Sequence, residues 1–189
     1  MNFTVINRPV VEPITLQEAK DHLRVDDDLE DALISELIFT ARSWCEQFLL
    51  RDLITQTQLL YIDGFDCQSI DIKANLQGVT TVKYLDSDGV QQTLADTEYV
   101  VDTVSTVGRI MLAYGSAWPA TYPELNAVEI EFDVGYGLAI DVPAPIRSAM
   151  LLLVGHYYLN RESVTVGVSV VETPQAVPML LDFYRVMEA

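Results

Sequence analysis

The chain has 189 residues, half of them hydrophobic, which is enough for one good-sized apolar core or two small ones. It carries 28 acidic and 11 basic residues, a net charge of −17, so sequence-specific binding to DNA or RNA is disfavoured because the protein repels phosphate backbones. The longest apolar run, residues 149–154, falls far short of the ~20 residues that span a bilayer, and no signal-peptide pattern is seen, so neither membrane insertion nor export is expected.

The N-terminal quarter of the chain predicts two helices. Thr15 and Glu18 have the spacing of a capping box, and apolar residues follow at helical intervals, so a short helix is expected over residues 16–24. The three aspartates at 26–28 supply capping groups and favourable charge for a second helix. Apolar side chains at helical spacing carry this longer helix to about Leu50.

From residue 53 to 135 the apolar period changes from helical spacing to alternation, which is typical of β-strands. In residues 128–134 apolar and acidic side chains alternate strictly, so one face of this strand is expected to be buried and the other wet. Asp88 and Gly89 are placed for a hairpin turn. Six or seven antiparallel strands are predicted, at residues 55–62, 70–74, 79–85, 90–94, 99–102, 109–112 and 127–134.

The C-terminal quarter returns to helical spacing. Pro143 and Pro145 open a strongly apolar helix that is predicted to end near Asn160 and to pack on the long N-terminal helix. Residues 163–178 show no helical period, and a last short helix is expected over residues 179–187.

These elements predict an α+β fold in two parts. Two N-terminal helices, together with one long and one short C-terminal helix, make a helical domain from residues 1–52 and 143–189. An antiparallel β domain, residues 53–142, is inserted between them. No internal repeat and no low-complexity segment interrupts this plan.

The motifs give no catalytic, cofactor-binding or metal-ligating constellation. Residues 135–137 read Gly-Tyr-Gly between a strand and a helix, but no βαβ unit surrounds them, so a glycine turn is a better interpretation than a dinucleotide site. The acidic run from Asp26 has Asp31 where a calcium loop requires glycine, which favours helix capping. His22 and His156, the only histidines, lie in different predicted helices, so no zinc site or histidine-activated nucleophile is indicated.

Four stretches of the chain, taken in order, are similar to one family. They read EPITLQEAKDHLRVDDDLEDALISELIFTARSWCEQFLLRDLITQT (12–57), YGSAWPAT (114–121), NAVEIEFDVGYG (126–137) and VPAPIRSAMLLLVGHYYLNRES (142–163), and LLDFYRV (180–186) looks like the family's last helix. Their order and spacing resemble the head-tail connector, or adaptor, proteins of tailed phages, prophages and gene transfer agents. Each stretch alone is generic, so the resemblance rests on their succession over most of the chain.

The resemblance implies a structural virion protein with no catalysis, no metal and no cofactor. Such an adaptor binds the portal protein ring after DNA packaging and links it to the next neck or tail (stopper) protein. It works as a homo-oligomeric ring, dodecameric when assembled, in the virion neck, and it waits in the host cytoplasm before assembly. A strongly acidic protein suits a ring lumen through which DNA must slide without sticking.

Two groups of residues are the candidate protein contacts. Apolar and aromatic character near the chain end favours a portal contact made by Met179, Leu180, Phe183, Tyr184 and Arg185. Trp118 and Tyr122, which stand beside prolines, are candidates for a contact between subunits of the ring, although Trp118 also fits a plug at one end of the β domain.

Two other classes of protein remain as alternatives. A head-completion or tail-terminator subunit would share the acidic and motif-free character of this chain. A small-molecule enzyme would need an acidic pocket near the β domain, with Tyr136 or His156 as acid or base, and a deep pocket with convergent polar groups would be its signature.

Overall fold

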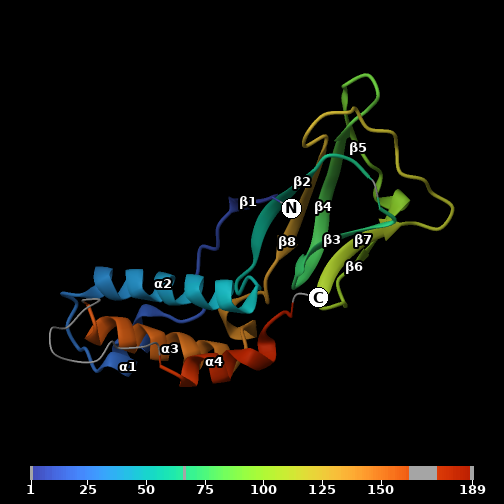
Figure 1. Cartoon of the computed structure of the whole chain (residues 1–189). Helices are drawn as coiled ribbons and strands as arrows, with labels where there is room; N and C mark the ends of the chain where they lie inside the picture. Colours follow the sequence, from blue (N-terminus) through green and yellow to red (C-terminus); the bar gives the residue numbers. More distant parts are fainter. Residues whose placement is uncertain (1, 66, 162–173, 188–189) are drawn as a thin grey trace, which may run out of the picture. The chain divides into compact units, whose positions relative to one another are not determined.

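The computed structural model describes residues 2–65, 67–161 and 174–187, which divide into two compact units (Figure 1). The β unit contains the described residues up to Pro9 and from Thr55 to Tyr136, and the helical unit contains those from Val10 to Ile54 and from Gly137 onward. The described residues form four α-helices and two antiparallel sheets, so the predicted α+β class is confirmed.

The first residues of the chain belong to the β unit, whereas the sequence placed all of residues 1–52 in the helical part. Strand β1 (Asn2–Asn7) pairs antiparallel with β2 (Gln56–Ile62). The ring of Phe3 packs edge-on against Phe132, with 6.1 Å between the centroids. The prediction was wrong at this end because a single short strand has little periodic signal, and its partner lies far along the chain.

Two antiparallel sheets make up the β unit. The larger has the strand order β1-β2-β8-β4-β5 and the smaller has the order β3-β7-β6. The remaining strands are β3 (Ser69–Ala74), β4 (Leu76–Leu85), β5 (Gln91–Thr93), β6 (Tyr99–Asp102), β7 (Val107–Leu112) and β8 (Val128–Val134), with a short 3-10 helix η1 (Asp96–Glu98) before β6. Apolar side chains from both sheets form one core, which includes Leu60, Ile70, Ile72, Val82, Ile110, Ile130 and Phe132.

Strand β8 confirms the alternation that its sequence predicted. Its four apolar side chains are fully buried, and its three acidic side chains are half-buried on the opposite face of the sheet. There the hydroxyl of Thr57 donates to Asp133 at 2.7 Å, and Lys83 lies 3.5 Å from Glu129. The hairpin between β4 and β5 is also as predicted, since Gly89 adopts a φ of +76° in its turn.

Helices α1 (Leu16–Leu23), α2 (Asp31–Leu49), α3 (Ala144–Leu159) and α4 (Ala176–Leu181) form the helical unit, with the 3-10 turns η2 (Ala139–Asp141) and η3 (Asp182–Tyr184). Helix α3 packs on α2, as predicted, and also on α1 and α4 (Figure 1). The capping box of α1 is present, because Thr15 and Glu18 each accept the other's backbone amide. The apolar face of α3 therefore forms the centre of this unit.

The aspartates at 26–28 do not cap the long helix, which begins at Asp31, three residues after Asp28. The residue before α2 is Glu30, and its side chain makes no capping hydrogen bond. Asp28 instead accepts from Lys20 of α1 at 2.6 Å, and Asp31 accepts from the same ammonium at 2.8 Å. These hydrogen bonds raise the pKa of Lys20. Tertiary ion pairing therefore replaces the local capping that the sequence predicted.

Candidate docking surfaces

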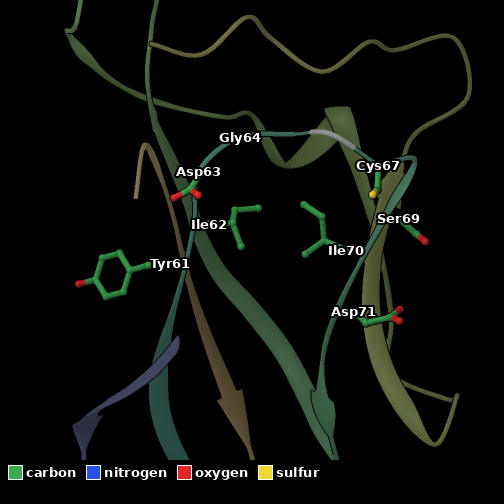
Figure 2. Close-up of a pocket in the computed structure, with 8 residues that line it drawn as sticks. All are labelled: Tyr61, Ile62, Asp63, Gly64, Cys67, Ser69, Ile70 and Asp71. Atoms are coloured by element: carbon green, nitrogen blue, oxygen red, sulfur yellow. The ribbon is translucent and has the colours of Figure 1, made fainter. Parts of the chain in front are cut away.

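A cavity of about 550 Å³ lies in the β unit where β2 ends and β3 begins (Figure 2). Ile62 and Ile70 point toward one another across this cavity, whereas Tyr61 and Asp71 point away from it. The polar groups around it therefore do not converge on one point, as acid-base chemistry would require. The cavity is a gap at the end of a two-sheet core and does not have the signature of an active site.

The other chemically reactive groups are also dispersed. Tyr136 lies in the β unit, and His156 of α3 packs against Tyr157 with 5.6 Å between ring centroids. Cys45 is buried, and burial raises the pKa of its thiol to about 12, so it is not a ready nucleophile. Across residues 2–65, 67–161 and 174–187 no cluster of three potential metal ligands occurs, and no helix there is long and apolar enough to cross a bilayer.

The end of the helical unit carries an exposed apolar surface. Val177, Leu181 and Val186 are buried and hold α4 and η3 on the unit. On the outward side lie Met179, Phe183 and Met187, with exposed fractions of 80%, 91% and 81%, which we call the C-terminal surface. Large apolar side chains this exposed are typical of protein-binding sites.

The five C-terminal residues singled out from the sequence differ in their surroundings. Met179 and Phe183 are exposed, whereas Leu180 and Tyr184 are half-buried. The guanidinium of Arg185 lies 5.0 Å above the ring of Phe48 on α2, so its charge is already engaged by a cation–π contact. Two of these five residues are therefore fully available to a partner.

Trp118 and Tyr122 have different roles in the β unit. The indole of Trp118 stacks on Phe65 with 4.6 Å between the ring centroids, and its Nε1 donates to the carbonyl of Cys67 at 2.8 Å. This indole is half-buried against the core. Tyr122 is 39% exposed and lies against Gly89 of the β4–β5 hairpin. Trp118 thus ties two loops together, and the surface of Tyr122 remains open.

The helical unit contains an apolar groove of about 600 Å³ that was not predicted from the sequence. We call it the helical groove; it lies between the segment before α1, the middle of α2 and the turn η2, and it is lined by Val11, Glu12, Ile14, Thr15, Leu16, Ser35, Ile38, Leu138, Ala139 and Ile140. Leu138 and Ile140 on its rim are 67% and 78% exposed. The apolar residues Leu138 and Ile140, which follow the Gly-Tyr-Gly stretch, could have indicated this groove from the sequence, but the stretch was interpreted only as a glycine turn.

Local geometry explains how η2 presents these two residues. The amide of Leu138 donates to the carboxylate of Asp141 at 2.8 Å, which closes the turn. A Cβ on Gly137 would lie 2.6 Å from that carboxylate, and the residue has a φ of +126°. Only glycine therefore fits at 137, and the tight turn leaves Leu138 and Ile140 outside the core.

The one charged residue among those lining the helical groove is Glu12. Its carboxylate accepts from Arg42 twice, at 2.6 Å from Nε and 3.3 Å from Nη2. Arg42 also pairs with Glu46 at 3.0 Å. Burial raises the pKa of Glu46, and the charge of Arg42 opposes that rise. The groove is therefore apolar and carries no unpaired carboxylate.

A family model described as head completion protein matches residues 12–187. One similar solved chain comes from the neck of an empty gene transfer agent (GTA) particle computed with C6 symmetry, with 23% identity, a TM-score of 0.83, and coverage of 100% of this chain and 97% of that one. Another comes from the virion of a native GTA particle, with 22% identity, a TM-score of 0.81, and coverage of 100% of this chain and 97% of that one. A third comes from the neck of a native GTA particle computed with C12 symmetry (22%, 0.75, 98% and 97%). A comparison with curated protein sequences gives no match.

Proposed function

This chain belongs to the head completion protein family, and on that premise we propose that it is a connector in the neck of a tailed phage or related particle. The family is structural, so the chain is not an enzyme. Its proposed role is to bind the portal ring after DNA packaging and to present a platform for the next neck or tail protein. Before assembly it would remain in the host cytoplasm.

The proposed working form is a homo-oligomeric ring, dodecameric when assembled. The similar chains come from necks computed with C6 and C12 symmetry, and their fold matches this chain over almost its full length. A net charge of −17 supports a ring through which DNA passes, because acidic walls repel the phosphate backbone. Contacts between proteins, and not contacts to DNA, would then hold the ring in place.

The C-terminal surface is the feature that supports the proposed contact with the portal. Its three residues are exposed, yet the segment that bears them, which includes α4 and η3, is held by the buried side chains of Val177, Leu181 and Val186. The amide of Val186 also donates to the carbonyl of Leu49 at 3.0 Å. A preformed apolar surface loses little conformational entropy on binding. Phe183, the aromatic residue of this surface, is the proposed anchor, and the ring of Tyr184 packs edge-on against it with 5.5 Å between the centroids.

Native mass spectrometry of the protein mixed with the portal protein of the same gene cluster tests this proposal. The wild type should give a saturable, ring-sized mass increase over the portal alone. Phe183→Asp should weaken portal binding by at least about tenfold, because it places a charge in an apolar contact. Leu125→Asp, at a residue of the β unit with 77% exposure, is the matched control and should bind normally. Absence of wild-type binding would instead favour a position elsewhere in the neck or tail.

A further inference from the structure

Strand β1 is held in the β unit by two kinds of contact. Its backbone pairs antiparallel with β2 at the edge of the larger sheet. Its side chain in the core is Phe3, whose ring packs edge-on against Phe132 and lies 5.6 Å from the Nζ of Lys73. Val5 and Ile6 are largely outside the core, with exposed fractions of 42% and 45%. The strand therefore occupies a site made by β2, Phe132 and Lys73, which we call the β1 socket.

A short hinge joins β1 to the helical unit. The chain passes from one unit to the other between Pro9 and Val10, and the hinge residues 8–11 belong to no helix or strand. Val10 is fully exposed, whereas the chain is fixed again at Glu12 by its ion pair with Arg42. Proline fixes its own φ and restricts the residue before it to extended conformations. An extended hinge can lead β1 to a neighbouring copy without refolding of either unit.

Charge distinguishes β1 from the rest of this acidic chain. The net charge is −17, yet the first eleven residues include Arg8 and no acidic residue. Strand β2, which receives β1, is also uncharged. Among the other edge strands, β5 has only three residues, and β3 and β6 carry Asp71 and Asp102. Two copies can therefore join through β1 and β2 without placing like charges against each other in the contact.

Exchange of β1 between copies would use contacts that the chain already makes. The same backbone pairing and the same Phe3 packing form whether β1 joins its own β2 or that of another copy, so the cost lies in bringing two copies together. A ring on the portal offsets that cost, because it holds neighbours at a high effective concentration. Fully extended, the four hinge residues reach about 14 Å, so only a copy held directly alongside can receive the strand.

We propose that β1 exchanges between neighbouring copies of this chain in the assembled ring, where it enters the β1 socket of the next copy. Each copy then gives one strand and receives one, which is the head-to-tail contact that a closed ring requires. The inference rests on the proposed ring and assigns the contact that closes it. In the free, dilute protein β1 stays in its own socket.

An isotope-mixing experiment tests the exchange. Labelled and unlabelled protein, both with the photocross-linking amino acid p-benzoylphenylalanine in place of Thr4, are mixed in equal amounts. Thr4 is exposed and lies opposite Leu59, so irradiation should link position 4 to β2 whether or not the strand has exchanged. Mass spectrometry distinguishes links within one copy, in which both peptides carry the same isotope, from links between copies, which can join different isotopes.

In rings on the portal, about half of the links to β2 should join different isotopes, because an exchanged strand meets either kind of neighbour with equal chance. In the dilute protein nearly all links should have one isotope. The same probe in place of Thr93, an exposed residue of the opposite edge strand that lies opposite Lys83, is the control and should give links of one isotope in both samples. Links of one isotope alone from position 4 in rings, or no link to β2 in any sample, would overturn the inference.

A second variant locks β1 in its own socket. Thr4→Cys with Leu59→Cys, combined with Cys67→Ser, is oxidised in dilute solution so that a disulfide can form only within one chain. The locked protein should still bind the portal as single copies, but its yield of complete rings should be at least about tenfold lower. The same protein after reduction is the matched control and should form normal rings. Normal rings from the locked protein would contradict the exchange.

The two experiments separate this inference from the proposed function. If wild-type protein does not bind the portal, but links between different isotopes form from position 4 in the concentrated protein, the portal role fails and the exchange stands. If rings form on the portal with links of one isotope alone, the exchange fails and the proposed function stands.

Discussion

In the β unit, the ion pairs join neighbouring strands of one sheet, whereas in the helical unit most of them join a helix to another helix or to a loop. Lys83 pairs with Glu129 across neighbouring strands of the larger sheet. In the helical unit Arg147 of α3 pairs with Glu18 of α1, and Arg161 pairs with Glu30 ahead of α2 at 2.6 Å. The two units have similar net charges, four basic against twelve acidic residues (−8) and seven against sixteen (−9), so the difference lies in placement.

This contrast indicates how each unit keeps its shape. Backbone ladders and one apolar core specify the β unit, and its sheet-face ion pairs add little, since an exposed pair contributes roughly 0–1 kcal/mol. In the helical unit, ion pairs between elements help to orient the helices without burying apolar side chains. Large apolar side chains remain exposed in the helical groove and on the C-terminal surface of this unit. We therefore regard the β unit as the scaffold and the helical unit as the bearer of apolar contacts.

Loss of a core side chain should have the largest effect on stability, and this effect should be confined to the unit that contains the side chain. Phe132→Ala removes a fully buried ring from the β core and should lower the free energy of unfolding by about 3–5 kcal/mol. Leu153→Ala is the counterpart in the helical unit, with about 2–5 kcal/mol expected. Hydrogen exchange should speed up most in the strands for the first variant and in the helices for the second. Equal changes in both units would contradict their separation.

Removing Arg42 should come next, because it leaves Glu12 and Glu46 without their cation. Arg42→Met keeps most of the buried stem, and a loss of about 3 kcal/mol is expected at neutral pH. The already raised pKa of Glu46 should rise further. A carboxyl with a raised folded-state pKa stabilises the protein when it is protonated, and this stabilisation is lost as pH rises through that pKa.

The difference in free energy of unfolding between wild type and Arg42→Met should therefore become smaller as the pH falls from 7 to 5. Urea unfolding of both proteins at each pH measures this difference. Adding Glu46→Gln to this variant is the control, since it removes the titrating group and should flatten the pH dependence. If the loss of stability in Arg42→Met does not change with pH, Glu46 does not titrate in this range and the expected link to its pKa is wrong.

Trp118→Phe should have a smaller effect of about 1 kcal/mol, because it removes the hydrogen bond to Cys67 but keeps an aromatic ring on Phe65. Thermal unfolding measures the change, and Tyr122→Phe, which retains its ring on Gly89, should be close to neutral. If Trp118→Phe leaves stability unchanged but breaks ring assembly, Trp118 is a subunit contact after all.

The smallest effect should come from Asp102 at the β6–β7 turn. The hydroxyl and amide of Ser105 and the amide of Val104 lower the pKa of Asp102 to about 2. A carboxyl with a lowered pKa stabilises the fold above its unfolded value of 3.8 and loses this effect as pH falls toward 2. Asp102→Asn should speed amide exchange at Val104 and Ser105 at pH 6, and wild type should approach the variant near pH 2. Unchanged exchange at pH 6 would exclude this role.

Local patterns in the sequence determined much of this protein. Alternation located the strands after residue 53, the capping box placed α1, and the apolar stripe of α3 marked its contact with α2. The order of short stretches indicated the family, which the match over residues 12–187 supports. Each of these features depends on residues that lie within a few positions of one another, so it can be predicted from the sequence alone.

Only the tertiary structure decided where distant segments meet. It placed β1 beside β2, paired Asp28 with Lys20, and used Trp118 to tie loops together. It also formed the helical groove from three segments, of which residues 11–16 and 138–140 lie more than 100 positions apart. Each of these outcomes depends on packing between segments far apart in sequence, for which a residue's own neighbours carry no signal.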